Sequence, residues 1–123
     1  MTNTEINKRI AELYLPCDYL VTNGIVELVS TITKLGSHGE PYEVVEKYDE
    51  FNPCEDWNQL MPLCIERGIS LYRPKHINSD VWIASKYDSS KQQVHEDYGT
   101  NPQIALCLCL IKVLEAKEIE NNG

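Results

Sequence analysis

The sequence has few basic residues and no long hydrophobic run. Its 123 residues contain 11 Lys and Arg against 19 Asp and Glu, so the formal net charge is −8. Proteins that bind the nucleic-acid backbone need Lys and Arg to displace counterions, so this charge argues against direct nucleic-acid binding and favours a basic partner. No run of about eighteen apolar residues occurs, so we expect no membrane span.

The sequence also lacks the patterns of metal sites and disulfide frameworks. None of its three histidines has a Cys or His at the spacing of metal ligands. Five cysteines, an odd number without a signal-peptide pattern, favour free thiols and a reducing cytoplasm. Cys107 and Cys109 are two residues apart on an expected helix, which places them about 200° apart around its axis. We therefore predict no metal and no cofactor.

Motifs of enzyme active sites are missing too. There is no glycine-rich phosphate loop, no G-x-S-x-G, no H-E-x-x-H and no C-x-x-C. The carboxylates between Asp49 and Asp56 are interpreted as solvated groups and a helix cap, and Cys54 has no neighbouring histidine to activate it as a nucleophile. We therefore do not expect an enzyme.

The composition that is present belongs to an ordinary globular domain. Hydrophobic residues make up 42% of the chain and charged residues 24%. Its length suits a single domain over residues 1–123, with no repeat or linker to divide it. We expect the folded core to span about residues 3–117 and the tail at 118–123 to be frayed.

A capped helix forms the clearest signal in the middle of the chain. Asp56 and Gln59 have the spacing of a capping box, in which the third helical side chain reaches back to the backbone amide of the cap. This predicts a helix that begins near Trp57. Gly68 suits the left-handed residue that closes such a helix.

Two further helices are predicted near the ends of the chain. Thr2 and Glu5 form a second capping box ahead of a helix over residues 3–14. Pro102 suits the first position of a helix over residues 102–116. That last helix has almost no polar face, so we expect it to be enclosed by the domain or to lie between copies in a homo-oligomer.

The strands of the first half are predicted around a tight turn. Asn23-Gly24 favours a β-hairpin between residues 19–22 and 25–33. A helix over residues 25–35 is the alternative, because apolar residues there also recur at helical spacing. Residues 42–48 alternate with mixed faces, which suits a strand at the edge of a sheet.

Three strands are expected in the second half, over residues 69–72, 80–87 and 93–96. In the middle strand, Ile83 and Ala84 point to opposite faces, and both faces are apolar. This predicts a central strand covered on two sides. The fold class is therefore α+β, with three helices and a mostly antiparallel sheet packed between helices, as an α/β/α sandwich or as two layers.

Short motifs resemble those of the NinX-like phage proteins. The matching segments are Asn52-Pro53-Cys54, Leu60-Met61-Pro62, Ile65-Glu66 and Ile69-Ser70-Leu71 in the middle, Glu5 to Arg9 in the first helix and Asn101-Pro102 with Ala105 in the last. The resemblance spans roughly Glu5 to Val113, although Trp57 stands where Pro is usual and Met61 where Trp is usual. It implies the phage ABA sandwich, with a sheet between helical layers. No activity is established for this family, so the resemblance implies no functional residue.

The stretch from residue 40 to residue 57 is acidic and carries aromatic side chains. It holds seven carboxylates against Lys47 alone. One interpretation is a solvated rim at the edge of the core; the other is a contact surface on which carboxylates steer a basic protein and aromatics supply contact area. The candidate surface consists of Glu43, Glu46, Asp49, Glu50, Phe51, Asn52, Glu55 and Trp57.

Two classes of function follow. The first is a small phage or prophage accessory protein that binds a host or phage protein with a basic surface in the host cytoplasm. The alternative is a module that binds a small ligand or nucleotide without catalysis. An anionic ligand would need a basic pocket, and the cations able to build one are Lys34, Arg67, Arg73, Lys75, Lys86 and Lys91.

Overall fold

The computed structural model describes residues 1–14, 18–74, 80–89 and 91–122, with side chains as far as Lys117. In these ranges the chain forms three helices and six strands. Their bounds are α1 Asn3–Tyr14, β1 Tyr19–Thr22, β2 Ile25–Leu35, β3 Pro41–Glu50, α2 Trp57–Glu66, β4 Ser70–Tyr72, β5 Trp82–Asp88, β6 Gln93–Gly99 and α3 Pro102–Asn122. The α+β class and the three helices are confirmed. The helix α3 continues to Asn122, six residues beyond the end expected at residue 116.

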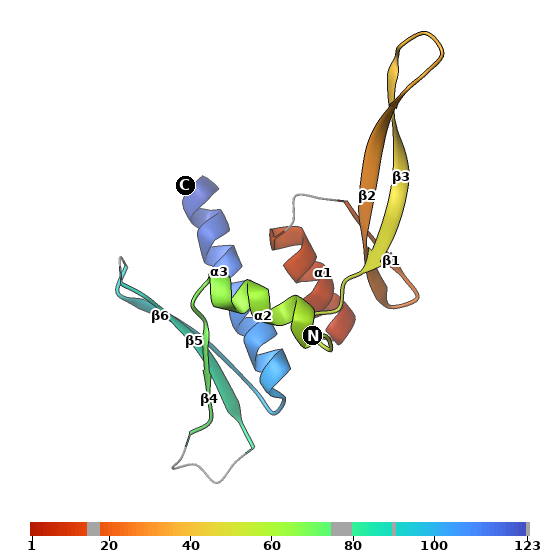
Figure 1. The fold of residues 1–123 in the computed structure, drawn as a ribbon. Helices are drawn as coiled ribbons and strands as arrows, with labels where there is room; N and C mark the ends of the chain where they lie inside the picture. The colour runs from red at the N-terminus through yellow and green to blue at the C-terminus, as the bar shows by residue number, and fades with distance from the viewer. Residues whose placement is uncertain (15–17, 75–79, 90, 123) are drawn as a thin grey trace.

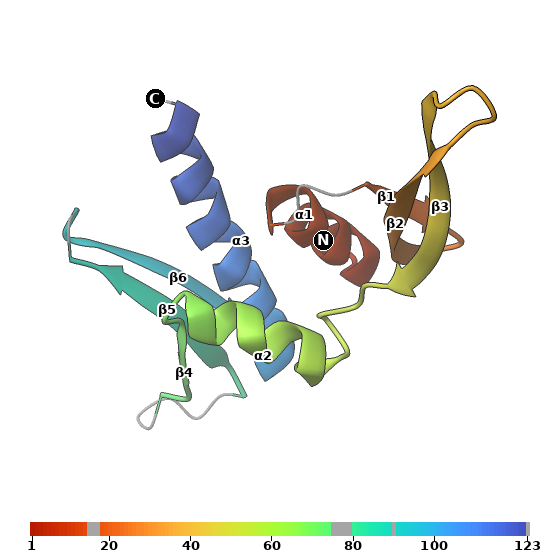
Figure 2. The ribbon, with the colours of Figure 1, turned by 45° about the horizontal axis from the view of Figure 1, so that its top comes forward.

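The six strands divide into two antiparallel sheets instead of forming one. Sheet A has the order β1-β2-β3 and sheet B the order β4-β5-β6. Figures 1 and 2 show the three helices between these sheets, with α1 beside sheet A and α3 beside sheet B. The layer order therefore differs from the expected sheet between helical layers.

The helix α3 forms the centre of the core. Six of its residues between Ala105 and Leu114 are at most 4% exposed, and Ile111 and Val113 are 7% exposed. One side of α3 packs on α1 and the other on β5 and β6, while α2 contacts it as well. The apolar surface of this helix is therefore covered within one chain, and its burial does not require a second copy.

Local signals set the ends of α2 as expected. The carboxylate of Asp56 accepts a hydrogen bond from the backbone N–H of Asn58 at 2.9 Å. At the other end Gly68 has φ +67°, and its N–H donates to the carbonyl of Ile65. The next N–H, that of Ile69, donates to a carbonyl one residue further back, which completes a Schellman motif.

The hairpin predicted at Asn23-Gly24 is present. Both residues have positive φ, 52° and 79°, as a type I′ turn requires. The strand β2 then runs unbroken from Ile25 to Leu35, which excludes the alternative helix. The strand β3 is at the edge of sheet A, as predicted from its mixed faces.

The central strand of sheet B is covered on one face only. Ala84 is fully buried and Trp82 packs against the core, so this side of β5 faces the helices. On the other side Ile83 lies between Tyr72 and Tyr98, which are 45% and 53% exposed. Among the described residues no helix covers this face, so the expected burial of both faces is wrong. The two sheets present four faces, and the three helices lie between the sheets, so they cover only the inner face of each sheet.

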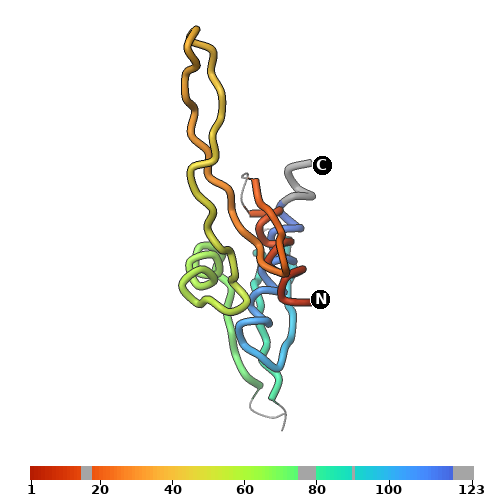
Figure 3. Tube along the Cα trace, turned by 90° about the vertical axis from the view of Figure 1, so that its right-hand side faces the viewer, coloured from red at the N-terminus to blue at the C-terminus, as the bar shows by residue number. Residues whose placement is uncertain are grey.

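A two-stranded extension projects from sheet A. The short strand β1 pairs with residues 25–28 of β2, so among the described residues the cross-strand partners of residues 29–48 all lie within that same range. We call residues 29–48 the arm. Figure 3 shows the arm extending beyond the helices. The register of the arm shifts between Ser30 and Thr31, where a bulge in β3 accommodates the extra residue.

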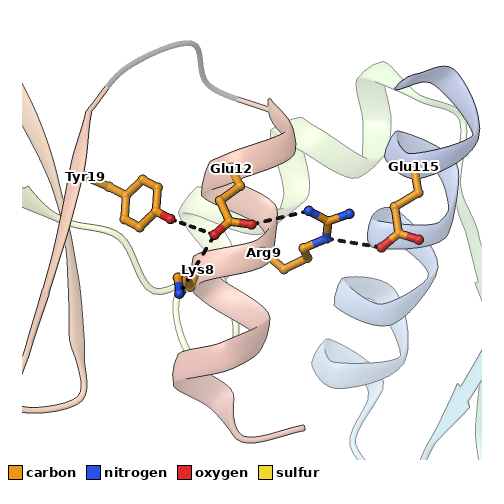
Figure 4. A network of polar contacts seen from close by, with 5 residues as sticks. All are labelled: Lys8, Arg9, Glu12, Tyr19 and Glu115. Carbon is orange, nitrogen blue, oxygen red and sulfur yellow. Dashed lines mark hydrogen bonds and ion pairs between the residues drawn. The ribbon is translucent and has the colours of Figure 1, made fainter. Parts of the chain in front are cut away.

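A polar network fastens sheet A to the helices (Figure 4). The hydroxyl of Tyr19 on β1 donates to Glu12 of α1 at 2.6 Å, and Arg9 bridges Glu12 to Glu115 of α3 at 3.3 and 3.2 Å. The hydrogen bond from Tyr19 lowers the pKa of Glu12, and Arg9 lowers it further. The same bond raises the pKa of Tyr19. Strand, first helix and last helix are therefore joined through two charged side chains.

Candidate functional site

Four residues of the candidate surface lie exposed on β3: Glu43, Glu46, Asp49 and Glu50. Successive side chains of a strand point to opposite faces of its sheet. Since Val26 and Phe51 point into the core, the register places Glu43 and Glu50 on the opposite face. Asp49 is on the core-facing side, where its carboxylate is 3.2 Å from the exposed ammonium of Lys47.

We call the face of sheet A that points away from the helices the outer face. It includes Leu20, Glu27, Val29, Glu43, Val45, Tyr48 and Glu50. Tyr48 is 52% exposed and Val45 is 42% exposed. This face therefore combines carboxylates with exposed apolar and aromatic side chains, as the sequence interpretation required of a contact surface.

Two carboxylates meet directly across the outer face. Glu27 of β2 is the cross-strand partner of Glu50 of β3. Like charges in this position destabilise a sheet, typically by a few tenths of a kcal/mol to about 1 kcal/mol. A cation placed between the two side chains would remove that repulsion.

Phe51 does not belong to this surface. It is only 6% exposed and is part of the hydrophobic core, and its N–H donates to the carbonyl of Val26. As the first residue after β3, it turns the chain back towards the helices. The structure therefore corrects the assignment of Phe51 to a contact surface.

Asn52 serves the architecture of the loop that carries it. Its side-chain carbonyl accepts from Asn7 of α1 at 2.9 Å, and its backbone N–H donates to the side chain of Gln59 at 2.6 Å. Its amide group also donates to Glu55 at 3.1 Å, so Glu55 is engaged although it is exposed. The predicted return of Gln59 to the amide of Asp56 is wrong, because Gln59 reaches the preceding loop instead.

The rest of the Asn52-Pro53-Cys54 loop is held from two more directions. The backbone N–H of Cys54 donates to the side chain of Asn7 at 3.1 Å. The side chain of Gln103 on α3 donates to the carbonyl of Pro53 at 3.1 Å. Asn7 and Gln103 are 5% and 7% exposed. All three helices thus bind this loop. These contacts give the Asn52-Pro53-Cys54 motif a role in holding the fold together that requires no catalytic chemistry.

Trp57 is the first residue of α2 and is 42% exposed. It does not form part of the outer face, because α2 begins after the chain has left sheet A. Of the eight candidate residues, the structure therefore brings only those of β3 together on the extended strand pair.

The described cysteines are free and buried: Cys54, Cys64, Cys107 and Cys109. Burial raises the pKa of Cys64 to about 12 and that of Cys109 to about 11. Cys17 lies outside the described residues. Within the described ranges, no group of His, Cys, Asp and Glu side chains is arranged to hold a metal ion. The helices found there are also too short or too polar to cross a membrane.

Several of the cations named for an anionic ligand converge on one cavity. Arg67, Lys86 and Lys91 line it, together with His95 and Lys117, which the sequence interpretation did not include. Lys34 lies on the arm, Arg73 pairs with Asp80 at 2.9 Å, and Lys75 is outside the described residues. Spacing along the chain offers no signal for this convergence, because it depends on three elements.

A comparison with known protein families matches residues 1–113 of the chain to the family described as Bacteriophage P22, NinX. No function is known for that family. No curated protein and no solved structure matches the chain.

Proposed function

Because the chain belongs to the Bacteriophage P22 NinX family, we propose that it is a phage accessory protein that binds a basic protein of the host or the phage, without catalysis. The binding surface is the outer face of sheet A. The observation that carries this proposal is the charge of the β2–β3 hairpin. Residues 25–50 contain six carboxylates and two lysines.

The position of this charge suits steering of a partner. Exposed carboxylates on a projecting strand pair attract basic surfaces over distances of about a Debye length, roughly 8 Å at physiological ionic strength. Tyr48 and Val45 then supply contact area that salt does not weaken. A cation between Glu27 and Glu50 would also relieve their repulsion in the free protein.

Binding of a partner would also stabilise the arm. A two-stranded ribbon without a covering layer is only marginally stable in water. Most side chains of residues 29–48 are exposed, and among them Leu35 is 71% exposed and Tyr42 is 46% exposed. Contact with another protein would bury part of this apolar surface and order the arm.

Charge reversal on the outer face tests the proposal. Glu43→Lys and Glu50→Lys each change the net charge by two without touching the core. Asp80→Lys is the matched control, because its side chain is 90% exposed and lies next to sheet B. We would immobilise each protein, pass over it a lysate of phage-infected cells, and quantify the retained proteins by mass spectrometry at low and high salt.

The expected result is a set of basic proteins that wild type and Asp80→Lys retain, that salt elutes, and that both outer-face variants lose. The same retained proteins for all four chains would contradict the proposal. So would retention that is independent of salt, because the proposed attraction is electrostatic.

A further inference from the structure

A cavity of about 290 Å³ lies where the end of α2, the second half of α3 and the β5–β6 hairpin meet. Its basic lining residues are Arg67, Lys86, Lys91, His95 and Lys117, and its carboxylates are Glu66 and Asp88. The chain as a whole has a net charge of −8 and only 11 Lys and Arg. Four of those cations at one cavity reverse the sign of the local charge, and this cavity is separate from the outer face of sheet A.

Arg67 is held in place at this cavity with part of its hydrogen-bonding capacity unused. Its guanidinium stacks on the ring of Tyr14, 4.7 Å from the centroid. Its Nη1 is buried and has no hydrogen-bond partner among the described residues. The carboxylate of Glu66 is 3.4 Å away, which is close enough for charge attraction but lacks the geometry of a hydrogen bond. A charged group in a partly buried position is stabilised by a nearby opposite charge, and an anion bound in the cavity would supply that charge.

The carboxylates do not cancel this positive charge. Glu66 already accepts a hydrogen bond from the hydroxyl of Tyr14 at 3.2 Å, in addition to its contact with Arg67. Both carboxylates keep their charge, so Glu66 and Asp88 offset two of the four positive charges on Arg67, Lys86, Lys91 and Lys117. The lining therefore retains an excess of positive charge.

We propose that this cavity binds a small anion that bears a phosphate group. Arg offers a planar fork of donors that matches phosphate oxygens, and Lys offers a compact charge. The cavity is at the small end of the range for ligand sites, about 300–1,000 Å³. Inorganic phosphate and the phosphate of a nucleoside monophosphate share the required chemistry.

The test is a titration of the full chain with three probes at matched ionic strength: inorganic phosphate, AMP and adenosine. Binding is followed by calorimetry and by the shift of amide NMR signals. Lys86→Ala combined with Lys117→Ala removes two charges from the lining and leaves Arg67 with its contacts to Tyr14 and Glu66. Lys34→Ala combined with Lys47→Ala is the matched control, because both residues lie on the arm. Circular dichroism checks that both variants remain folded.

Phosphate should bind wild type and the arm variant alike and should bind the cavity variant at least about tenfold more weakly, since each lost hydrogen bond to a charged group is worth about a factor of ten or more. Tighter binding of AMP than of phosphate would support a nucleotide, and equal binding would support phosphate itself. Three results would overturn the proposal: no binding of phosphate or AMP, equal binding by the cavity variant, or equal binding of adenosine and AMP.

Discussion

Two buried amide side chains position the loop between the sheets and the helices. Asn7 and Gln103 come from α1 and α3, and they bond the backbone of the Asn52-Pro53-Cys54 loop across 47 and 50 residues of sequence. A buried loop needs such partners, because its backbone groups have no strand or helix to pair with. Nothing in the sequence around either amide distinguishes it from a solvated helical residue, so these contacts were not predictable.

Replacement of Asn7 by Ala should therefore lower stability. The N–H of Cys54 would lose its acceptor in a buried setting, which costs about 1–3 kcal/mol of the free energy of unfolding. Urea denaturation measures the change, with Asn58→Ala on the exposed side of α2 as the control. Equal stability of the two variants would show that the loop finds other partners.

At the scale of elements, the predictable features were those with a local cause. The capping residues Thr2 and Asp56 and the turn at Asn23-Gly24 act on neighbours in the chain, and the structure confirms each. Where a side chain can bond either a local or a distant partner, the sequence does not predict which of the two it bonds. Gln59 illustrates this, since it bonds Asn52 and the carbonyl of Glu50 instead of its own helix start.

The contact between β1 and α1 should depend on pH. Tyr19 lowers the pKa of Glu12 below its ordinary value of 4.5 by donating a hydrogen bond to the ionised carboxylate. A carboxyl group with a lowered pKa stabilises the fold above its unfolded pKa, and this stabilisation is lost as the pH falls through the folded pKa. Tyr19→Phe should therefore destabilise the protein at about pH 7, and the difference from wild type should shrink below about pH 4.5.

Urea unfolding of both proteins between about pH 3 and about pH 7 measures this difference. Tyr87→Phe, at an exposed tyrosine of sheet B, is the control and should show no such trend. A difference that stays constant over the whole pH range would mean that Tyr19 acts by packing alone.

At the scale of the whole molecule, the order of the sheet and helix layers could not be predicted from the sequence. Alternation along a strand shows which face is apolar, but it does not say which strands share a sheet. Ile83 illustrates this, because the sequence suggested a helix above it where the structure has the rings of Tyr72 and Tyr98 beside it. The basic cavity was equally hidden, because its cations come from α2, the β5–β6 hairpin and α3.

The reactivity of the buried thiols measures how readily the core formed by α2 and α3 opens. Cys64, Cys107 and Cys109 are at most 1% exposed, and with pKa values of about 12 and 11 Cys64 and Cys109 are protonated near neutral pH. Alkylation by iodoacetamide should therefore require unfolding, so all three should be modified slowly and at one common rate that rises with urea. Peptide mapping by mass spectrometry measures the rates, with the denatured chain as the reference for full reactivity. Rapid modification of Cys64 alone would show that α2 opens independently.

The central place of α3 determines the order in which the protein can mature during synthesis. Both sheets and the other two helices precede α3 in the chain, yet the core closes only when α3 packs against α1, β5 and β6. A ribosome adds about 5–20 residues per second, so the earlier elements wait for seconds with their apolar faces unburied. When synthesis reaches Pro102, about five-sixths of the chain has been made, and its apolar faces are still open to chaperones. We expect this exposure to end when α3 has been translated and packs against the other elements.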